Sequence, residues 1–440
     1  MLMDLETIPL ANFLIGRYNL LQTDGFAKLR AKAWERFGQV GLPSLRSDNY
    51  HYIPLKRLYE HSLGYTTASH APIVNRADLE PSILPECQNS VLVFVDGHFC
   101  PELSNWTALP PSVVISTLTE GNKRFTTFFS NRWTQLAKEE QDPLSLLNAA
   151  LFQEGLFIYL PPKVIVEVPL QILHVTTREN EGLRLLFPRI ELFAGKSSSL
   201  QLIHTVLDNS QDTVVSIMGA DLVLEEQAAV QQSVLRMQHR NEWIFDIVRV
   251  TLKRDSNFKG LLLTDGAHTV RQDYRMELLG ENSEASLEGI SLLQGNKHSH
   301  TYVHVDHQAP HCRSNQKFKT VLMDNARSSF EGKIYIHSEA QKTEAFQLSN
   351  NLLLSEQAIA YARPNLEIFA DDVKASHGAT VGSLDLDSLF YLQSRGIPAK
   401  KAKGILIHGF CQEVIDHLTI PSAQEKMQKW LNQFLGYDHE

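Results

Sequence analysis

Leu279-Gly-Glu-Asn-Ser283 is one copy of a short pattern that recurs through the middle of the chain. The pattern is a leucine, two variable residues, then Gln, Asp or Asn, and then Ala or Ser. Short runs of alternating apolar residues lie between the copies. The other copies are Leu224-Glu-Glu-Gln-Ala228, Leu252-Lys-Arg-Asp-Ser256, Leu322-Met-Asp-Asn-Ala326 and Leu354-Ser-Glu-Gln-Ala358.

This repeat predicts a β-solenoid. Asp and Asn tolerate the left-handed backbone that the corners of a solenoid rung require. A single rung cannot bury its own apolar face, so several rungs must stack. An ordinary antiparallel sandwich with Asx turns is the alternative interpretation of the same pattern.

Length and composition place the chain among ordinary globular proteins. It has 440 residues, 43% of them hydrophobic, which is enough for two or three domains. The net charge of −9 argues against nucleic acid or an anionic membrane surface as the main partner. No apolar run approaches the roughly 18 residues of a membrane span. Four widely separated cysteines and an N-terminus unlike a signal peptide lead us to expect a cytoplasmic protein.

The periodicity of the apolar residues divides the chain into three parts. We expect residues 1–155 to form a mainly helical N-terminal region with a few strands, and 156–385 to form the solenoid. Residues 386–440 are expected to form a C-terminal helical domain. The terminal helices could cover the open ends of the solenoid, which otherwise expose edge strands.

The densest polar cluster of the sequence lies at residues 298–312. Neutral imidazoles and a thiol could bind Zn²⁺ or Fe²⁺, although the spacings match no known zinc motif. A β-solenoid enzyme that modifies a polysaccharide or an acyl group at this cluster is therefore a second hypothesis for the chain. The simpler interpretation is a set of solvated rung edges. The cluster comprises His298, His300, His304, His307, His311 and Cys312.

The segment from Glu367 to Gly382, EIFADDVKASHGATVG, resembles the signature of the SufD family of iron–sulfur cluster assembly subunits. Ala340-Gln-Lys-Thr343, Asn350-Asn-Leu-Leu-Leu-Ser355 and Leu389-Phe-Tyr-Leu also resemble that family. The resemblance implies a right-handed parallel β-helix core between N-terminal and C-terminal helices. It implies a non-catalytic scaffold subunit that pairs with SufB and binds the ATPase SufC.

The resemblance also implies a site. In this family a nascent cluster is thought to form at the SufB–SufD interface, with a histidine of SufD as one ligand, and His377 matches that histidine. The chain would hold this cluster only transiently and have no permanent cofactor. Family members often carry a cysteine two residues earlier, where this chain has Ala375. The remaining ligands would then come from SufB, because thiolates are the usual ligands of iron–sulfur clusters. We expect Asp371 or Asp372 to orient the imidazole of His377.

The helices after residue 399 are the expected docking site for SufC. Phe410, Trp430 and Phe434, together with Val414, provide more apolar surface than short helices can readily bury alone. Capping of the solenoid is the alternative use of the same surface. We also expect the solenoid edge at residues 366–373 to pair with another subunit, and to form a homodimer when SufB is absent.

Overall fold

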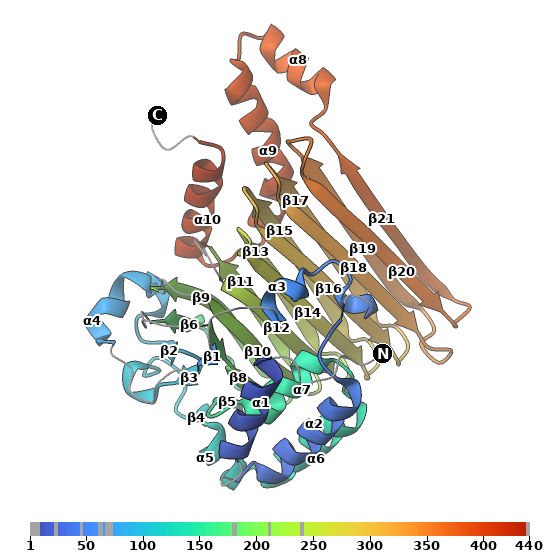
Figure 1. The fold of residues 1–440 in the computed structure, drawn as a ribbon. Helices are drawn as coiled ribbons and strands as arrows, with labels where there is room; N and C mark the ends of the chain where they lie inside the picture. The colour runs from blue at the N-terminus through green and yellow to red at the C-terminus, as the bar shows by residue number, and fades with distance from the viewer. Residues whose placement is uncertain are drawn as a thin grey trace.

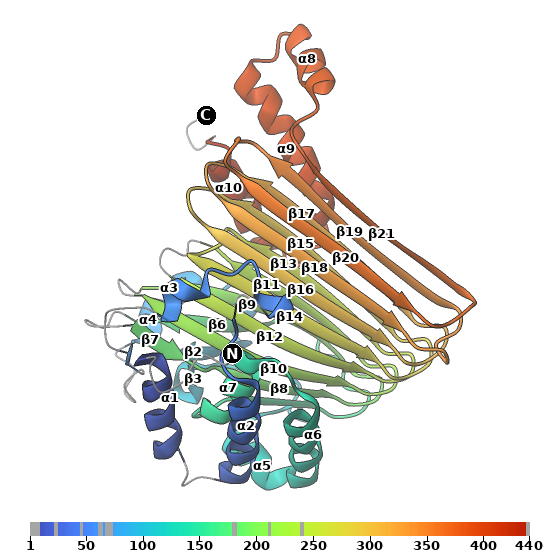
Figure 2. The same cartoon turned by 45° about the vertical axis from the view of Figure 1, so that its right-hand side comes forward.

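Two long parallel sheets face one another in the computed structural model and enclose a filled interior (Figures 1 and 2). From β8 (Arg189–Ala194) onward, successive strands of the chain alternate between the sheets, so each sheet pairs every second strand. This is the parallel β-solenoid that the repeat and the family resemblance predict. The structure describes residues 9–21, 25–44, 47–59, 65–66, 74–177, 183–209, 213–237 and 242–436.

Sheet A forms one wall of the solenoid. At the N-terminal end, β4 is antiparallel to β5, while β1 and β7 lie to one side. Its other strands are parallel, and β20 forms the far edge. The strands are β1 (Tyr65–Thr66), β4 (Val114–Thr117), β5 (Leu156–Leu160), β7 (Leu183–Leu186), β8 (Arg189–Ala194), β10 (Val214–Leu224), β12 (Glu242–Leu252), β14 (Thr269–Leu278), β16 (His298–His307), β18 (Arg327–Ile336) and β20 (Ile359–Ile368).

Sheet B forms the other wall and ends at β21. Its first two strands, β2 and β3, form the hairpin that the Asp96-Gly97 turn predicts, and both turn residues have positive φ. The strands are β2 (Val91–Val95), β3 (His98–Phe99), β6 (Leu170–Thr176), β9 (Ser199–Asp208), β11 (Ala229–Arg236), β13 (Asn257–Thr264), β15 (Glu284–Leu293), β17 (Arg313–Leu322), β19 (Thr343–Leu353) and β21 (Val373–Gly382).

The repeated sequence pattern marks the corners of the rungs. Gln227, Asp255 and Asn282 have φ of 60°, 58° and 59° at the corner that leads from sheet A to sheet B. The copy Leu322-Met-Asp-Asn-Ala326 lies at the opposite corner, which leads from sheet B to sheet A. Its left-handed residue is Asp324 instead of Asn325. The pattern therefore predicted corners correctly, but its copies do not occupy equivalent positions in the rungs.

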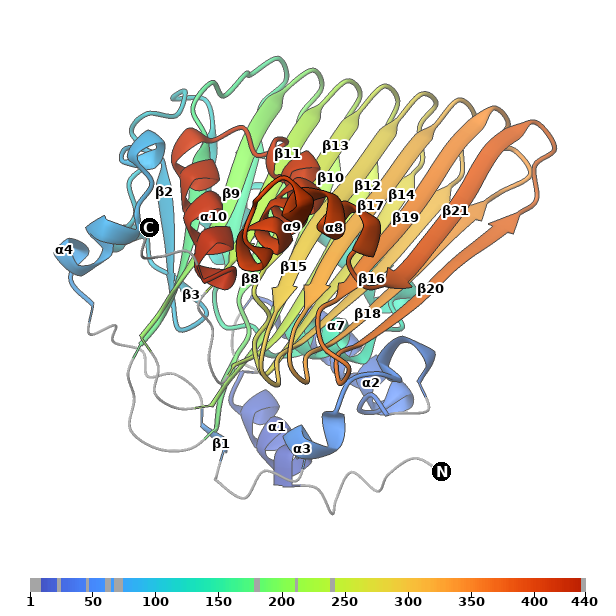
Figure 3. The same ribbon diagram turned by 90° about the horizontal axis from the view of Figure 1, so that it is seen from above.

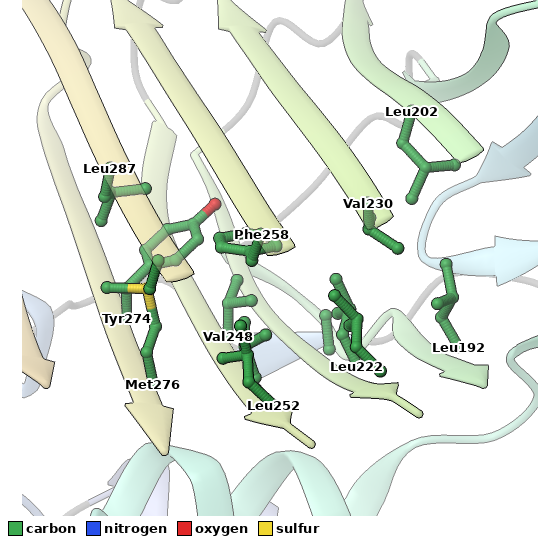
Figure 4. Close-up of a cluster of buried hydrophobic side chains, with 14 of the residues drawn as sticks. Leu192, Leu202, Leu222, Val230, Val248, Leu252, Phe258, Tyr274, Met276 and Leu287 are labelled. Carbon is green, nitrogen blue, oxygen red and sulfur yellow. The ribbon is translucent and has the colours of Figure 1, made fainter. Parts of the chain in front are cut away.

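Apolar side chains from both sheets fill the interior (Figure 4). Leu222 and Leu252 of sheet A meet Val230 and Phe258 of sheet B, and all four are at most 2% exposed. Full burial of one such side chain contributes about 1.5–3 kcal/mol to folding. Stacking of the rungs, rather than any single hairpin, therefore stabilises the solenoid.

The N-terminal helices pack on the outer face of sheet A. Helix α7 lies against Ile217 of β10 and Phe245 of β12, in one buried apolar cluster. Asp142 caps α7 by accepting hydrogen bonds from the backbone N–H groups of Leu144 and Ser145, as the Asp-Pro pair predicts. The helices are α1 (Pro9–Leu20), α2 (Ala27–Val40), α3 (Leu55–Tyr59), α4 (Arg76–Leu79), α5 (Leu118–Arg124), α6 (Thr126–Glu139) and α7 (Pro143–Leu151).

Buried ion pairs join this helical region to sheet A. The Nε atom of Arg249 lies 3.0 Å from Glu140 Oε2, and its Nη1 lies 2.8 Å from Asp273 Oδ1. The Nη2 of Arg132 on α6 lies 2.5 Å from Asp221 Oδ1 of β10. Removing one partner of such a pair leaves an uncompensated buried charge, which typically costs about 3–5 kcal/mol. These charges fix the helices against the sheet.

The C-terminal helices lie on the outer face of sheet B (Figure 3). Helices α9 (Ala399–Ile415) and α10 (Pro421–Phe434) cover that face, while α8 (Leu386–Ser394) projects from the end of β21 (Figure 1). The terminal helices thus cover the outer faces of the sheets and leave the end formed by β20 and β21 uncovered. The expectation that they cover both ends is wrong for this end, because their apolar sides face the sheets. In the described part of the chain, no helix is both long and apolar enough to cross a membrane.

Candidate functional site

The end of the solenoid formed by β20 and β21, here called the open end, carries His377. Val373 and Ala375 of β21 pack against the solenoid core. Side chains alternate between the two faces of a strand, so His377 lies on the same inward face. It is nevertheless exposed, because no further rung lies beyond β21 in the described structure. The imidazole therefore occupies the mouth of the solenoid interior.

The rest of the inward face of the open end is apolar. Every inward-facing position of β20 and β21 other than His377 holds an apolar residue, among them Leu366 and Ala379. Several apolar side chains at this end are exposed, including Phe369 at 59% and Val381 at 49%. Large exposed apolar surfaces commonly mark sites of protein association. A single polar ligand group thus lies within a surface that favours a protein partner.

Neither acidic neighbour expected to orient His377 faces it. Asp372 belongs to the turn before β21, where its side chain is exposed. Its Oδ2 lies 3.1 Å from the Nζ of Lys342. Asp371 is exposed in the same turn. The prediction is wrong for both residues because the rung corner, rather than the strand, positions them. Ala375 packs inward against the core, so a side chain there would face the same interior as His377.

The histidines of residues 298–312 do not converge on one site. His307 faces the interior, where its Nε2 lies 2.9 Å from Ser314 Oγ. His300 faces the other side of sheet A, with its Nδ1 2.8 Å from Ser329 Oγ. His311 forms a corner with φ of 60°. Burial lowers the pKa of His300 well below its usual value and that of His304 and His307 to about 4. Alternation of strand faces separates these groups, and the described residues contain no cluster of three or more ligands suited to a metal ion.

All four cysteines are buried and reduced. Burial raises the pKa of Cys87 to about 12, of Cys100 to about 11 and of Cys411 to about 12. It also raises the pKa of Cys312, whose Sγ lies 3.3 Å from Ser283 Oγ. The thiolate is the reactive form, so none of these thiols is suited to accept sulfur or bind iron in the folded chain.

The burial of the four cysteines predicts how many thiols of the native protein react with a thiol reagent. At pH 8, the folded chain should react with none of its four thiols when mixed with Ellman's reagent, and with all four in guanidinium chloride. The absorbance of the released thionitrobenzoate measures both values. Rapid reaction of one equivalent in the native state would show that a cysteine is accessible.

Three of the four residues expected to dock SufC are not at the surface. Val414 is fully buried, and Trp430 and Phe434 are each 8% exposed within a cluster that includes Ile290 of sheet B. Phe410 is only partly buried beside them. The prediction of direct contact with a partner is therefore wrong for Val414, Trp430 and Phe434. These side chains attach the helices to the solenoid, which is the alternative use that the sequence left open.

The exposed apolar surface of the C-terminal region lies on α8 instead. Leu386 and Phe390 are each 72% exposed, and Tyr391 of the same helix is also exposed, as is Ile405 on α9. Sequence reasoning predicted no docking surface on this helix. The signal was present as the run Leu389-Phe-Tyr-Leu in a helix too short to bury apolar residues on all sides.

The fold and the site together define a β-solenoid protein with one open, apolar end that carries a single histidine. A family model described as "SUF system FeS cluster assembly, SufBD core domain" matches residues 174–410, and one described as "SufBD protein N-terminal region" matches residues 18–172. The chain belongs to the SufB/SufD family of the SUF system for iron–sulfur cluster assembly.

The similarity to curated proteins agrees with this family assignment. The chain is 26% identical to the iron–sulfur cluster assembly protein SufD of Escherichia coli over 425 residues, which cover 95% of this chain and 96% of that protein. It is 26% identical to a SufBD family protein of Synechocystis over 424 residues, covering 91% and 89% of the two chains. It is 28% identical to SufD of Bacillus subtilis over 293 residues, covering 66% of each.

Proposed function

We propose that this chain is the SufD-type scaffold subunit of a SUF complex, which pairs with SufB and binds the ATPase SufC. The observation that carries the proposal is the open end, where one imidazole lies among apolar side chains. The chain itself performs no catalysis in this proposal. ATP hydrolysis belongs to SufC, and the cluster is cargo that is built and passed on.

Pairing with SufB is supported by the unpaired edges of β20 and β21. An exposed edge strand presents backbone donors and acceptors that another strand can satisfy. Exposed apolar residues such as Ile368 and Val381 flank these edges and would be buried by a partner. SufB is the proposed partner because the chain resembles SufD over most of its length.

The role proposed for His377 is to act as one ligand of the nascent cluster at this interface. Neutral imidazole is an accepted replacement for thiolate in iron–sulfur sites. Ala375 supplies no ligand, and the four buried cysteines of this chain lie away from solvent. The thiolate ligands and the acceptor of sulfur are therefore assigned to SufB.

Co-expression tests the proposal. An affinity-tagged chain should retain both SufB and SufC when the three are produced together, and the purified complex should hydrolyse ATP. Retention of neither partner by a folded chain would reject the function. The alternative of a β-solenoid enzyme at residues 298–312 has no supporting cluster in the described structure.

The isolated chain should associate with itself through the same end. Without SufB, the edges of β20 and β21 are left unpaired, and a second copy can satisfy them. Light scattering at micromolar concentrations should report the mass of a dimer, near twice 49.8 kDa. Addition of SufB should replace this dimer with a heterodimer, whereas a strictly monomeric mass would contradict the prediction.

A further inference from the structure

Pro364 lies in the middle of β20, the strand that forms one edge of the open end (Figure 2). Its ring leaves the backbone nitrogen without a hydrogen, so this residue cannot donate to a neighbouring strand. Within sheets, proline is found where the missing N–H would face solvent, which confines it to edge strands. The direction in which the backbone of β20 faces at this residue therefore decides what Pro364 removes.

Hydrogen bonds at the two ends of β20 give these directions. The N–H of Ile359, its first residue, donates to the carbonyl oxygen of Ala326, directly before β18. The N–H of Phe369, directly after β20, donates to that of Ile336 in β18. The pairing in between has no bulge, and successive residues turn their backbone groups alternately to one side and the other, so odd-numbered residues face β18. Even-numbered residues, Pro364 among them, face the free edge.

The free edge of β21 keeps all of its donors. The N–H of Glu344 in β19 donates to the carbonyl oxygen of Cys312, directly before β17, so even-numbered residues of β19 face β17 and odd-numbered ones face β21. A residue of a parallel strand bonds to the two residues that flank its register partner. The partner of Ala345 is Ala375, so the residues on either side of Ala375 face β19. The odd-numbered residues of 373–381 thus face the free edge, and none of them is proline.

The two halves of β20 also differ in their surroundings. Before Pro364, Tyr361 stacks on Tyr52 of the N-terminal region, with ring centroids 4.2 Å apart. After Pro364, Ile368 and Phe369 are exposed. The uncovered apolar surface along this edge therefore lies after the proline, beside the corner that leads into β21.

We propose that Pro364 is a specificity-determining residue of the open end, which divides the edge of β20 into two halves. A partner strand pairs with Leu366–Ile368 and ends at Pro364, because an extension would leave a carbonyl group of the partner unpaired there. A strand on β21 pairs along the whole edge. Proline on an edge strand is one of the ways in which proteins prevent pairing with a wrong strand. This inference rests on the proposed function, in which the partner at this end is SufB.

Hydrogen exchange in the complex with SufB reads the pairing of each edge. Mass spectrometry with electron-transfer fragmentation resolves single residues. We expect slow exchange for the N–H groups of Leu366 and Ile368 and of the odd-numbered residues of 373–381, and fast exchange for those of Ala360 and Ala362. Protection of Ala360 and Ala362 would overturn the role of Pro364 and leave the proposed function standing.

Proline substitution at two matched positions tests the same point through affinity. Ala362 and Ala379 each have an N–H that faces the free edge, so neither substitution removes a hydrogen bond of the sheets. Ala379→Pro should weaken the binding of SufB about fivefold or more, the loss expected for one backbone hydrogen bond, and Ala362→Pro should leave it unchanged. Equal loss in both variants, at equal melting temperatures, would contradict the proposal.

The converse substitution, Pro364→Ala, restores the missing donor. The isolated chain should then associate with itself more tightly, with a dissociation constant about fivefold lower by analytical ultracentrifugation. Unchanged self-association would show that the proline is only tolerated at this edge, and would sink the proposal. If SufB protects neither β20 nor β21 from exchange, the proposed function fails, and the comparison of Pro364→Ala with the unmodified chain still decides whether the proline limits pairing.

Discussion

Replacement of His377 by alanine is expected to lower the yield of iron–sulfur cluster on the reconstituted complex about tenfold or more. The imidazole is the one polar side chain on the inward face of the last rung, and Ala375 provides no substitute ligand. The cysteines of the chain cannot replace it, since all four are buried. Its loss should therefore be felt more strongly here than in a homologue that has a cysteine at the position of Ala375.

The substitution should leave the fold and the complex intact. His377 is exposed, and exposed substitutions of this kind usually change the free energy of unfolding by less than about 0.5 kcal/mol. The measurement is visible absorbance and iron content after anaerobic assembly, with the melting temperature of the chain beside it. Ser376→Ala is the matched control, because Ser376 is adjacent, exposed and on the outward face of β21. Wild-type rate and yield in His377→Ala would contradict the role.

The solenoid could be predicted because its signals are local. Most of the described corners have a left-handed residue within a short segment, and Gln227, Asp255 and Asn282 are examples. The alternating apolar residues between corners define the inward faces of the strands. The register that places Gln347 beside His377 could not be read in this way. It depends on the number of residues in each corner, which varies from rung to rung.

Packing between segments that are distant in the chain also could not be predicted from the sequence. The sequence suggests that Pro421-Ser422 and Glu425 form a capping box, but Glu425 pairs with Lys429. The backbone N–H of Ser422 instead donates to Oε1 of Glu86, at 3.0 Å. No local pattern can indicate a cap that lies 336 residues away. For the same reason the sequence did not indicate that Trp430 packs on sheet B, from which its apolar neighbours come, rather than on a partner.

The second large effect is expected at α8, where we propose that SufC docks. Exposed aromatic side chains are typical of the residues that dominate protein interfaces, and truncation of such a residue commonly costs about 2–4 kcal/mol of binding free energy. Phe390 is 72% exposed, and Tyr391 lies beside it in the chain. A deletion of residues 399–440 is a poor test, because α9 and α10 cover Leu261 and Ile290 of sheet B. Such a deletion would expose the sheet itself.

Substitution on α8 avoids that difficulty. Phe390→Ser combined with Leu386→Ser should leave the chain folded and paired with SufB, while SufC is lost from the complex in a pull-down. Leu20→Ser in α1 is the matched control, since Leu20 is 72% exposed, as are Leu386 and Phe390, but lies in the N-terminal region. The affinity for SufC, measured by titration calorimetry, should fall by a factor of about 30 or more, which corresponds to the lower end of that interface cost. Undiminished affinity in the double variant would exclude α8 as the docking surface and direct attention to the exposed sides of α9 and α10.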